Sequence, residues 1–169
     1  MFSKDNNVNS NYQNDGILYL NDNSEIICFP PKLNKTNFLV PLSITLIESY
    51  VFSFCDMLET LMIPSAINQI KSNIFNKCKN LKTIIITSDF IIIQNEAFLH
   101  CSNLEYKYYC SYETPLVALD AFEECDKLKT IFTTEKYQSE YFGRFEVKKR
   151  NVFEKNFSIS SWLSWFQRN

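Results

Sequence analysis

The amino-acid sequence predicts a solenoid of mixed α/β type, with one strand of a parallel sheet and one short helical segment in each coil. The main observation is a repeat. Phenylalanine, cysteine and leucine recur as Phe-x-x-Cys-x-x-Leu at intervals of 23, 23 and 24 residues, in units that begin at Phe52, Phe75, Phe98 and Phe122. A repeat of this length indicates units that bury their apolar faces by stacking on one another.

The residues around the repeat predict the elements within one coil. Leu58, Leu61 and Ile63 suit a short strand in a curved coil, and Pro64 ends that strand because proline cannot donate a backbone hydrogen bond. Apolar residues then occur at 70, 74, 75 and 78, which is one face of about two helical turns. We therefore expect one strand and one helical segment per coil, as in leucine-rich repeats.

The units resemble BspA-like leucine-rich repeats, whose pattern runs I-P-x-x-V-x-x-I-G-x-x-A-F-x-x-C-x-x-L. The match is close from Pro64 to Cys78, and Ala97-Phe98 and Ala121-Phe122 keep the Ala-Phe pair. Residues 15–19 and 26–30 are similar to the hairpin that often precedes such repeats. The sequence departs from the pattern at the glycine, where it has Glu48, Lys71, Gln94 and Ala118. This departure argues against a turn with positive φ at that point.

Three segments are expected along the chain. Residues 1–14 are Asn-rich and polar and are predicted to be a disordered arm. Residues 15–134 hold the repeats with their N-terminal hairpin. Residues 135–169 are predicted to be a C-terminal capping segment, because an open solenoid end exposes its last core layer.

The end of this capping segment has helical spacing, with apolar side chains at Ile159, Trp162, Leu163 and Phe166. We expect it to fold over the final coil. A membrane-surface helix is the alternative, and it is disfavoured because the polar face carries almost no basic residue.

Composition excludes several function classes. With only two glycines the chain has no Gly-rich phosphate loop, so no cofactor is predicted. A net charge of −2 gives no reason to expect nucleic acid. No apolar run approaches the ~20 residues of a membrane-spanning helix, so stable membrane insertion is not expected. Residues 1–15 lack a signal-peptide core, which favours a cytoplasmic protein, whereas the family resemblance implies a cell-surface or secreted one.

The four repeat cysteines are predicted to form a column of buried thiols that pack as small apolar groups. Equivalent positions in stacked coils lie ~4.8 Å apart, so four of them span ~14 Å and cannot surround one zinc ion. Disulfides between adjacent coils are compatible with that distance, but parallel side chains point the same way. No metal site is predicted. Cys28 and Cys110 lie outside the column.

Catalysis finds little support in the sequence. The single histidine, His100, precedes Cys101 and suggests a thiol nucleophile. Cys101, however, occupies the same register as three cysteines that no histidine precedes. We predict no catalytic residue, and a thiol enzyme remains a distant alternative.

The strands suggest a binding surface. Residues along a strand alternate between faces, so the row Met62, Ile85, Tyr108 and Phe132 is expected to point outward, with Tyr106 beside it. An exposed apolar row of this kind is typical of protein interfaces. Beside the row, charged side chains of alternating sign are expected to form ion pairs between neighbouring strands, at Glu59, Lys82, Glu105 and Lys129. Lys107 falls at an inward position, and a bulge there would reshuffle the outward residues.

We therefore predict that Met62, Ile85, Tyr106, Tyr108 and Phe132 bind a protein partner. The family resemblance implies a non-enzymatic interaction module, since BspA-like relatives occur on surfaces of anaerobic bacteria and parasitic protists and are associated with adhesion. The alternatives are an intracellular leucine-rich-repeat scaffold and a purely structural repeat protein. The identity of the partner is not fixed by these residues.

Overall fold

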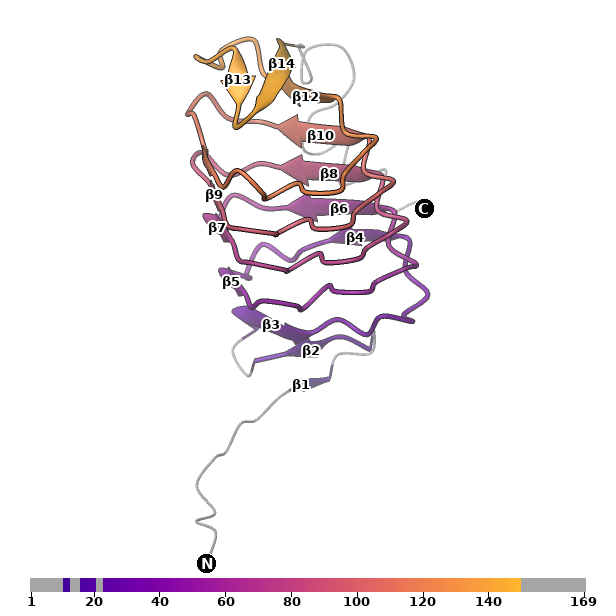
Figure 1. Cartoon of the computed structure of the whole chain (residues 1–169). Helices are drawn as coiled ribbons and strands as arrows, with labels where there is room; N and C mark the ends of the chain where they lie inside the picture. Colours follow the sequence, from indigo (N-terminus) through magenta and orange to yellow (C-terminus); the bar gives the residue numbers. More distant parts are fainter. Residues whose placement is uncertain (1–10, 13–15, 21–22, 150–169) are drawn as a thin grey trace, which may run out of the picture.

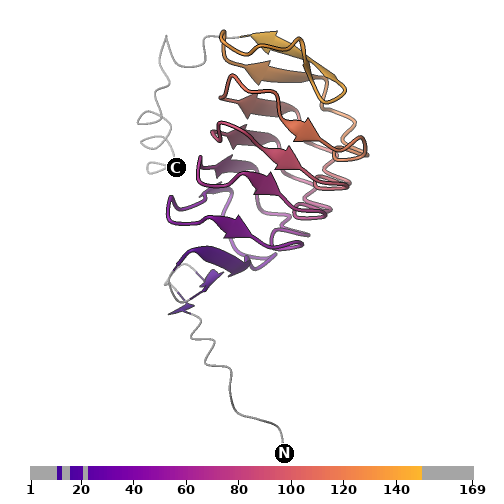
Figure 2. The ribbon, with the colours of Figure 1, turned by 90° about the vertical axis from the view of Figure 1, so that its left-hand side faces the viewer.

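The computed structural model describes residues 11–12, 16–20 and 23–149. Flat coils stack along one axis, from β1 and β2 at one end to β13 and β14 at the other (Figure 1). Successive coils place their strands side by side, which builds two parallel ladders that Figure 2 shows on opposite sides of the stack. The expected solenoid of leucine-rich-repeat type with a parallel sheet is confirmed.

The fourteen strands of the described residues form three sheets. The large sheet has the order β13-β14-β12-β10-β8-β6-β4 and comprises β4 (Asn37–Leu39), β6 (Thr60–Ile63), β8 (Thr83–Ile86), β10 (Tyr106–Tyr109), β12 (Thr130–Thr133), β13 (Tyr141–Phe142) and β14 (Phe145–Lys149). The second sheet comprises β7 (Gln69–Ile70), β9 (Ile92–Ile93) and β11 (Leu116–Val117). The N-terminal sheet comprises β1 (Asn11–Tyr12), β2 (Leu18–Tyr19), β3 (Glu25–Cys28) and β5 (Leu46–Ile47).

The register of the large sheet is continuous through β10. Lys107 aligns with Ile84 on one side and Ile131 on the other, so β10 contains no bulge. The extra residue of the longer repeat lies instead in the loop after the strand, which spans 110–115 between β10 and β11 but only 87–91 between β8 and β9. Lys107 therefore points into the interior with its aligned neighbours.

The predicted helical segments are wrong, since the described residues contain no helix. In their place the backbone bonds from coil to coil. The amide N–H of Phe75 donates to the carbonyl of Ala97 at 2.9 Å, and that of Lys77 donates to the carbonyl of Leu99 at 2.9 Å. These donors cannot also close i to i−4 helical bonds. The spacing of apolar residues was compatible with either arrangement.

Left-handed backbone also breaks any helix in these segments. Asn73 has φ 59° and Lys77 has φ 62°, and the equivalent residues Tyr50, Phe54, Glu96 and His100 share this conformation. The positions at which the family pattern has a glycine do not have a positive φ, as their side chains led us to expect. These positions are Lys71 and its equivalents Glu48, Gln94 and Ala118.

A column of phenylalanines runs through the interior. The ring centroids of Phe52 and Phe75 are 5.3 Å apart, those of Phe75 and Phe98 are 4.9 Å apart, and those of Phe98 and Phe122 are 4.8 Å apart, all stacked. Phe29 extends the column toward the N-terminus at 5.0 Å from Phe52. Each ring thus packs on the equivalent ring of the next coil.

The cysteine column lies beside the rings, and the prediction of buried thiols is confirmed. Each Sγ donates to the carbonyl oxygen of the repeat phenylalanine one coil earlier. The distances are 2.8 Å from Cys78 to Phe52, 3.1 Å from Cys101 to Phe75 and 3.1 Å from Cys125 to Phe98. Burial raises the pKa of Cys101, which keeps its proton available for this bond.

Two hairpins occupy the ends of the stack. At the N-terminal end β2 and β3 pair antiparallel, as expected, and β1 adds to β2 within the segment expected to be disordered. At the C-terminal end β13 turns through Gly143 (φ 59°) into β14, which pairs parallel with β12. Residues 1–10 of the expected arm, and Ile159 to Phe166 of the expected cap, lie outside the described residues.

The C-terminal hairpin supplies side chains to the last interior layer. The ring of Phe142 meets Tyr109 edge-on with centroids 5.2 Å apart, and Phe145 meets Phe122 edge-on at 5.5 Å. Phe142 is fully buried. The part of the expected cap between 135 and 149 is therefore a β-hairpin on the end of the core.

Replacing Phe75 by alanine tests the stacked column. Phe75 is fully buried between two rings, so we expect Phe75→Ala to lower the free energy of unfolding by ~3–5 kcal/mol, the usual cost of losing a buried aromatic side chain. Chemical denaturation measures this loss, and hydrogen exchange should report weaker protection in both adjoining coils. Leu42→Ala is the control, because Leu42 is 71% exposed and its loss should cost under ~0.5 kcal/mol. Equal losses in the two variants would contradict the column.

Candidate partner-binding surface

The structure brings the predicted row together on the outer face of the large sheet. Met62, Ile85, Tyr108 and Phe132 occupy equivalent positions of four neighbouring strands. The rings of Tyr108 and Phe132 stack with centroids 5.3 Å apart, and Tyr106 stacks on Phe132 at 6.3 Å. The five residues therefore share one face, as the alternation of the strands predicts.

Their exposure differs from the prediction. Met62, Ile85 and Phe132 are only 3%, 1% and 7% exposed, so the expectation of an open apolar row is wrong for them. They do not belong to the interior cluster, in which Leu61 and Ile63 lie. Tyr108 is half-buried and Tyr106 is 44% exposed. The accessible part of the row is thus its Tyr106 end.

A hollow of about 450 Å³ adjoins Tyr106 at the start of β10 and β12. Its walls combine aromatic and charged side chains, namely Glu105, Tyr106, Asp126, Lys127, Lys129, Thr130 and Phe132. The aromatic wall was predicted from the sequence, whereas Asp126 and Lys127 were not. The available signal was their place in the turn after Cys125, which leads directly into β12.

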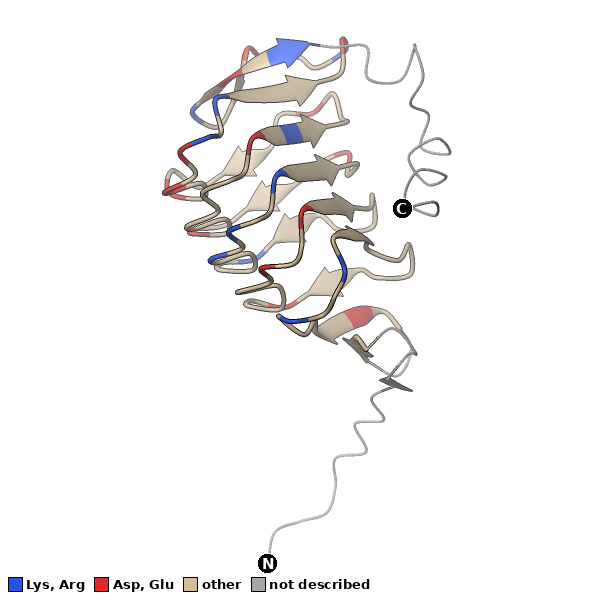
Figure 3. Cartoon of the chain, turned by 90° about the vertical axis from the view of Figure 1, so that its right-hand side faces the viewer, with Lys and Arg blue, Asp and Glu red and all other residues tan. Residues whose placement is uncertain are grey.

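Charged side chains alternate along the loops that lead into neighbouring strands (Figure 3). Lys82 Nζ lies 2.8 Å from Glu59 Oε2, as the alternating row predicted. Glu105 pairs with Lys127 at 3.8 Å, whereas the expected neighbour was Lys129. These side chains are about half exposed, so each pair contributes little to stability, and the row acts mainly as a polar border of the hollow.

Lys107 is the most unusual residue of the interior. It is fully buried, and its Nζ has no hydrogen-bond partner among the described residues. The amine lies 3.8 Å from the ring centroid of Phe142 and 4.1 Å from that of Phe122, which offers a charged amine some cation–π attraction. Removal from water opposes the charge and lowers the pKa of Lys107 well below that of an ordinary lysine.

The histidine–cysteine pair does not form a catalytic arrangement. His100 Nδ1 lies 2.6 Å from Glu124 Oε2 at the surface, while the Cys101 thiol is buried and bonds to the carbonyl of Phe75. His100 is one of the left-handed residues, and this backbone turns its side chain toward the next coil. Nothing in this geometry positions the imidazole to activate the thiol.

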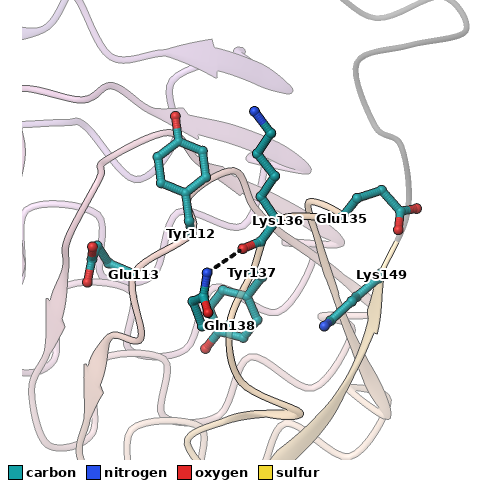
Figure 4. A pocket seen from close by; sticks show the side chains of 7 residues that line it. All are labelled: Tyr112, Glu113, Glu135, Lys136, Tyr137, Gln138 and Lys149. Carbon is teal, nitrogen blue, oxygen red and sulfur yellow. Dashed lines mark hydrogen bonds between the residues drawn. The ribbon is translucent and has the colours of Figure 1, made fainter.

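A second hollow of about 650 Å³ lies near the end of the stack, between the loop after β10 and the chain after β12 (Figure 4). Its walls are polar and carry both charges, with Tyr112, Glu113, Glu135, Lys136, Tyr137, Gln138 and Lys149. Gln138 Nε2 donates to the carbonyl of Lys136 at 3.5 Å. Burial raises the pKa of Tyr137 to about 12, and its hydroxyl donates to the carbonyl of Tyr141. The side chains of Tyr137 and Gln138 thus bond to the protein itself.

Among the described residues, no three His, Cys, Asp or Glu side chains lie close enough together to hold a metal ion. The same residues include no helix of the length and apolarity that crossing a bilayer requires.

Stacked coils with one strand per repeat, a phenylalanine column and a cysteine column define a leucine-rich-repeat solenoid. The sequence profile of the BspA type leucine rich repeat region matches residues 25–149 in six copies. The chain belongs to this family. No curated protein matches the sequence.

The fold is similar to those of two solved bacterial proteins. A leucine-rich repeat protein from Eubacterium ventriosum ATCC 27560 is similar in fold, with a TM-score of 0.57 and 14% identity over 91% of this chain and 54% of the other. A leucine rich cell surface protein from Faecalibacterium prausnitzii A2-165 matches with a TM-score of 0.49 and 20% identity, over 88% and 40% of the two chains. This chain thus spans about half the length, or less, of these two proteins.

Replacing Lys107 by methionine tests the cost of the buried amine. A buried donor without an acceptor costs about 1–3 kcal/mol, so Lys107→Met should raise the free energy of unfolding at pH 7 by about that amount. Lys32→Met, at an exposed lysine, should change it by less than ~0.5 kcal/mol.

The pH dependence gives an independent check. Because the folded pKa of Lys107 lies below the ordinary 10.5, the unfolded chain binds the extra proton between these values, and the parent becomes more stable as pH rises through that window. The advantage of Lys107→Met should therefore shrink from pH 7 to pH 10 in denaturation curves. A constant or growing advantage would contradict the desolvated amine.

Proposed function

We propose that this chain is a non-enzymatic protein-interaction module that binds a protein partner at the Tyr106 end of the large sheet. The surface consists of Tyr106 and Tyr108 with the charged walls of the adjoining hollow, and the buried ring of Phe132 supports the two tyrosines. Met62 and Ile85 are excluded from it, because they are buried and do not stack on Tyr106. The observation that carries the proposal is the exposed ring of Tyr106, stacked on Phe132 beside a charged border.

The chemistry of this surface suits a protein partner. Tyrosine presents a large apolar ring and a polar hydroxyl at modest cost in side-chain entropy, and it is enriched among residues that dominate interface energies. Phe132 holds the ring of Tyr106 from below, so the side chain is partly ordered before a partner arrives. The walls of the hollow carry both positive and negative charges, on Glu105, Asp126, Lys127 and Lys129. A surface of mixed charge favours specific partners over any surface of a single charge.

Family membership supports the same function class. The resemblance to BspA-like repeats implies binding to other proteins or to cells, and a repeat array offers an extended rigid surface for that purpose. An intracellular scaffold would use the same surface with a different partner. The two alternatives differ in location, not in the binding chemistry.

The binding surface is tested by replacing Tyr106. The parent chain is immobilised, a bound protein is identified from host-cell extract, and its affinity is then measured with purified components. The double variant Tyr106→Ser/Tyr108→Ser should keep its fold and weaken that affinity by 2 kcal/mol or more, about 30-fold in Kd.

The matched control is Tyr112→Ser, because Tyr112 is 50% exposed but lies outside this surface. It should leave the affinity unchanged. If the double variant folds and binds as the parent does, or if the control loses as much affinity, the partner binds elsewhere.

Location is tested separately. Adhesion implies exposure at the cell surface, so labelling of intact cells with a membrane-impermeant lysine reagent should modify exposed lysines such as Lys32 and Lys129. The control is the same reagent after lysis. Labelling that requires lysis would favour the intracellular scaffold.

A further inference from the structure

Side chains from two different parts of the fold enclose the buried amine of Lys107. Phe98 and Phe122 belong to the interior column, and their ring centroids lie 5.6 and 4.1 Å from Nζ. Phe142 belongs to the hairpin of β13 and β14, and its ring is the nearest of the three, at 3.8 Å. The hairpin lies at the end of the stack (Figure 1), so it forms the outermost part of this enclosure.

The hairpin is attached to the rest of the fold from one side. Strand β14 pairs with β12, and Arg144 Nη2 donates to the carbonyl of Phe122 at 3.1 Å. The turn at Gly143 packs closely on Val117, since a Cβ at the glycine would lie 3.1 Å from that of the valine. Strand β13 is the last of the sheet order, so no further strand of the described residues pairs beyond it. A terminal unit with one neighbour opens more easily than a coil with two.

We propose that the β13–β14 hairpin is an acid-sensitive latch, which opens at the end of the solenoid when Lys107 takes up a proton. In the closed form the amine has no hydrogen-bond acceptor among the described residues, so an ammonium there would have only the ring faces to stabilise it. In the open form water can hydrate the ammonium. Protonation therefore favours the open form, because the proton binds more tightly to it.

The direction of the pH effect follows from burial. Removal from water lowers the pKa of Lys107 in the closed form below the ordinary 10.5, and the nearby Cys125 offsets this only in part. In the open form the hydrated amine has its ordinary pKa. Between these two values the open form holds more protons than the closed form. The opening constant therefore rises about tenfold for each unit by which the pH falls through this window.

The other ionisable groups around the amine leave the window from pH 9 to pH 7 to Lys107. Strands β8 and β12 on either side carry no ionisable side chain. Burial raises the pKa of the Cys101 thiol and of the Tyr109 and Tyr137 hydroxyls, which keeps these groups neutral below pH 9. The Cys125 thiol donates to the carbonyl of Phe98. The charged side chains of the hairpin are exposed, namely Arg144, Glu146, Lys148 and Lys149.

The latch adjoins the proposed binding surface but does not rest on it. Phe132, which supports the two tyrosines, aligns with Lys148 of β14. Opening of the hairpin would leave β12 as the edge strand of the large sheet. The experiments on the latch use the chain alone, so their outcome is independent of any partner.

Acylation of lysines in the full chain tests the latch, with an amine-reactive ester as the probe and peptide mass spectrometry as the readout. The ester attacks neutral amines. At the exposed Lys148 the neutral fraction, and with it the rate, should fall about tenfold per unit from pH 9 to pH 7. At Lys107 the open fraction rises by the factor by which the neutral fraction of the open form falls. The rate at Lys107 should therefore be constant over this range, and at pH 9 it should be far below that of Lys148.

Two variants on β13 accompany the acylation experiment. Phe142→Ala removes the nearest cover of the amine and should raise the rate at Lys107 about tenfold or more. Tyr141→Ala, at the 56% exposed neighbour on the same strand, should leave the rate as in the parent. A rate at Lys107 that falls with pH in step with Lys148 would overturn the proposal, since the amine would then be hydrated in the closed form.

Hydrogen exchange distinguishes opening of the hairpin from unfolding of the whole solenoid. After correction for intrinsic exchange, the opening constant of amides in the ladder between β12 and β14 should be about 100-fold larger at pH 7 than at pH 9. Lys107→Met should abolish this difference, whereas Lys148→Met, the same substitution at an exposed site of β14, should retain it. The amide of Phe75 in the central coils should be protected far more strongly. Equal protection of the central and terminal amides, or no pH difference in the parent, would contradict the latch.

Discussion

The structure depends on backbone hydrogen bonds that run from each coil to the next. They form the parallel ladder of the large sheet, a second ladder through β7, β9 and β11, and a third series through the phenylalanine segments. Because all three run in the same direction, every residue lies directly over its equivalent one repeat away. The rings of the phenylalanine column stack and the cysteine thiols reach the carbonyl one coil earlier for this reason. The register of one ladder therefore also sets the register of the other two, and each coil is stabilised mainly by its two neighbours.

The same constraint explains the buried amine. Lys107 takes the interior position that Ile84 and Ile131 occupy in the adjoining coils, and the ladder fixes the strand in that register. A bulge would carry the amine to solvent but would break hydrogen bonds to both neighbours. The chain accommodates the amine among the rings of Phe98, Phe122 and Phe142 instead. The C-terminal hairpin, which contributes Phe142, thus completes both the last core layer and the surroundings of Lys107.

The large sheet carries two kinds of surface on one face. Near the start of β10 and β12, Tyr106 and the charged hollow are accessible, and we assign partner binding to them. Two residues further along the strands, Met62 and Ile85 are buried. The accessible part of this face is therefore its Tyr106 end.

The sequence by itself determined the solenoid and the burial of the repeat phenylalanines and cysteines, because equivalent residues at a nearly constant interval stack on one another. The register of β10 was left open by the sequence, and only the structure showed that it contains no bulge. The sequence also placed Met62, Ile85, Tyr106, Tyr108 and Phe132 on a single face, since strand alternation is a local property. Only the tertiary structure decided that residues 70–78 form a turn-rich side and not a helix, because an amide can bond within its coil or to the next, and apolar spacing does not distinguish these. Only the tertiary structure separated exposed Tyr106 from buried Met62 and Ile85, because the alternation of a strand sets the face of a side chain but not how much of it stays accessible.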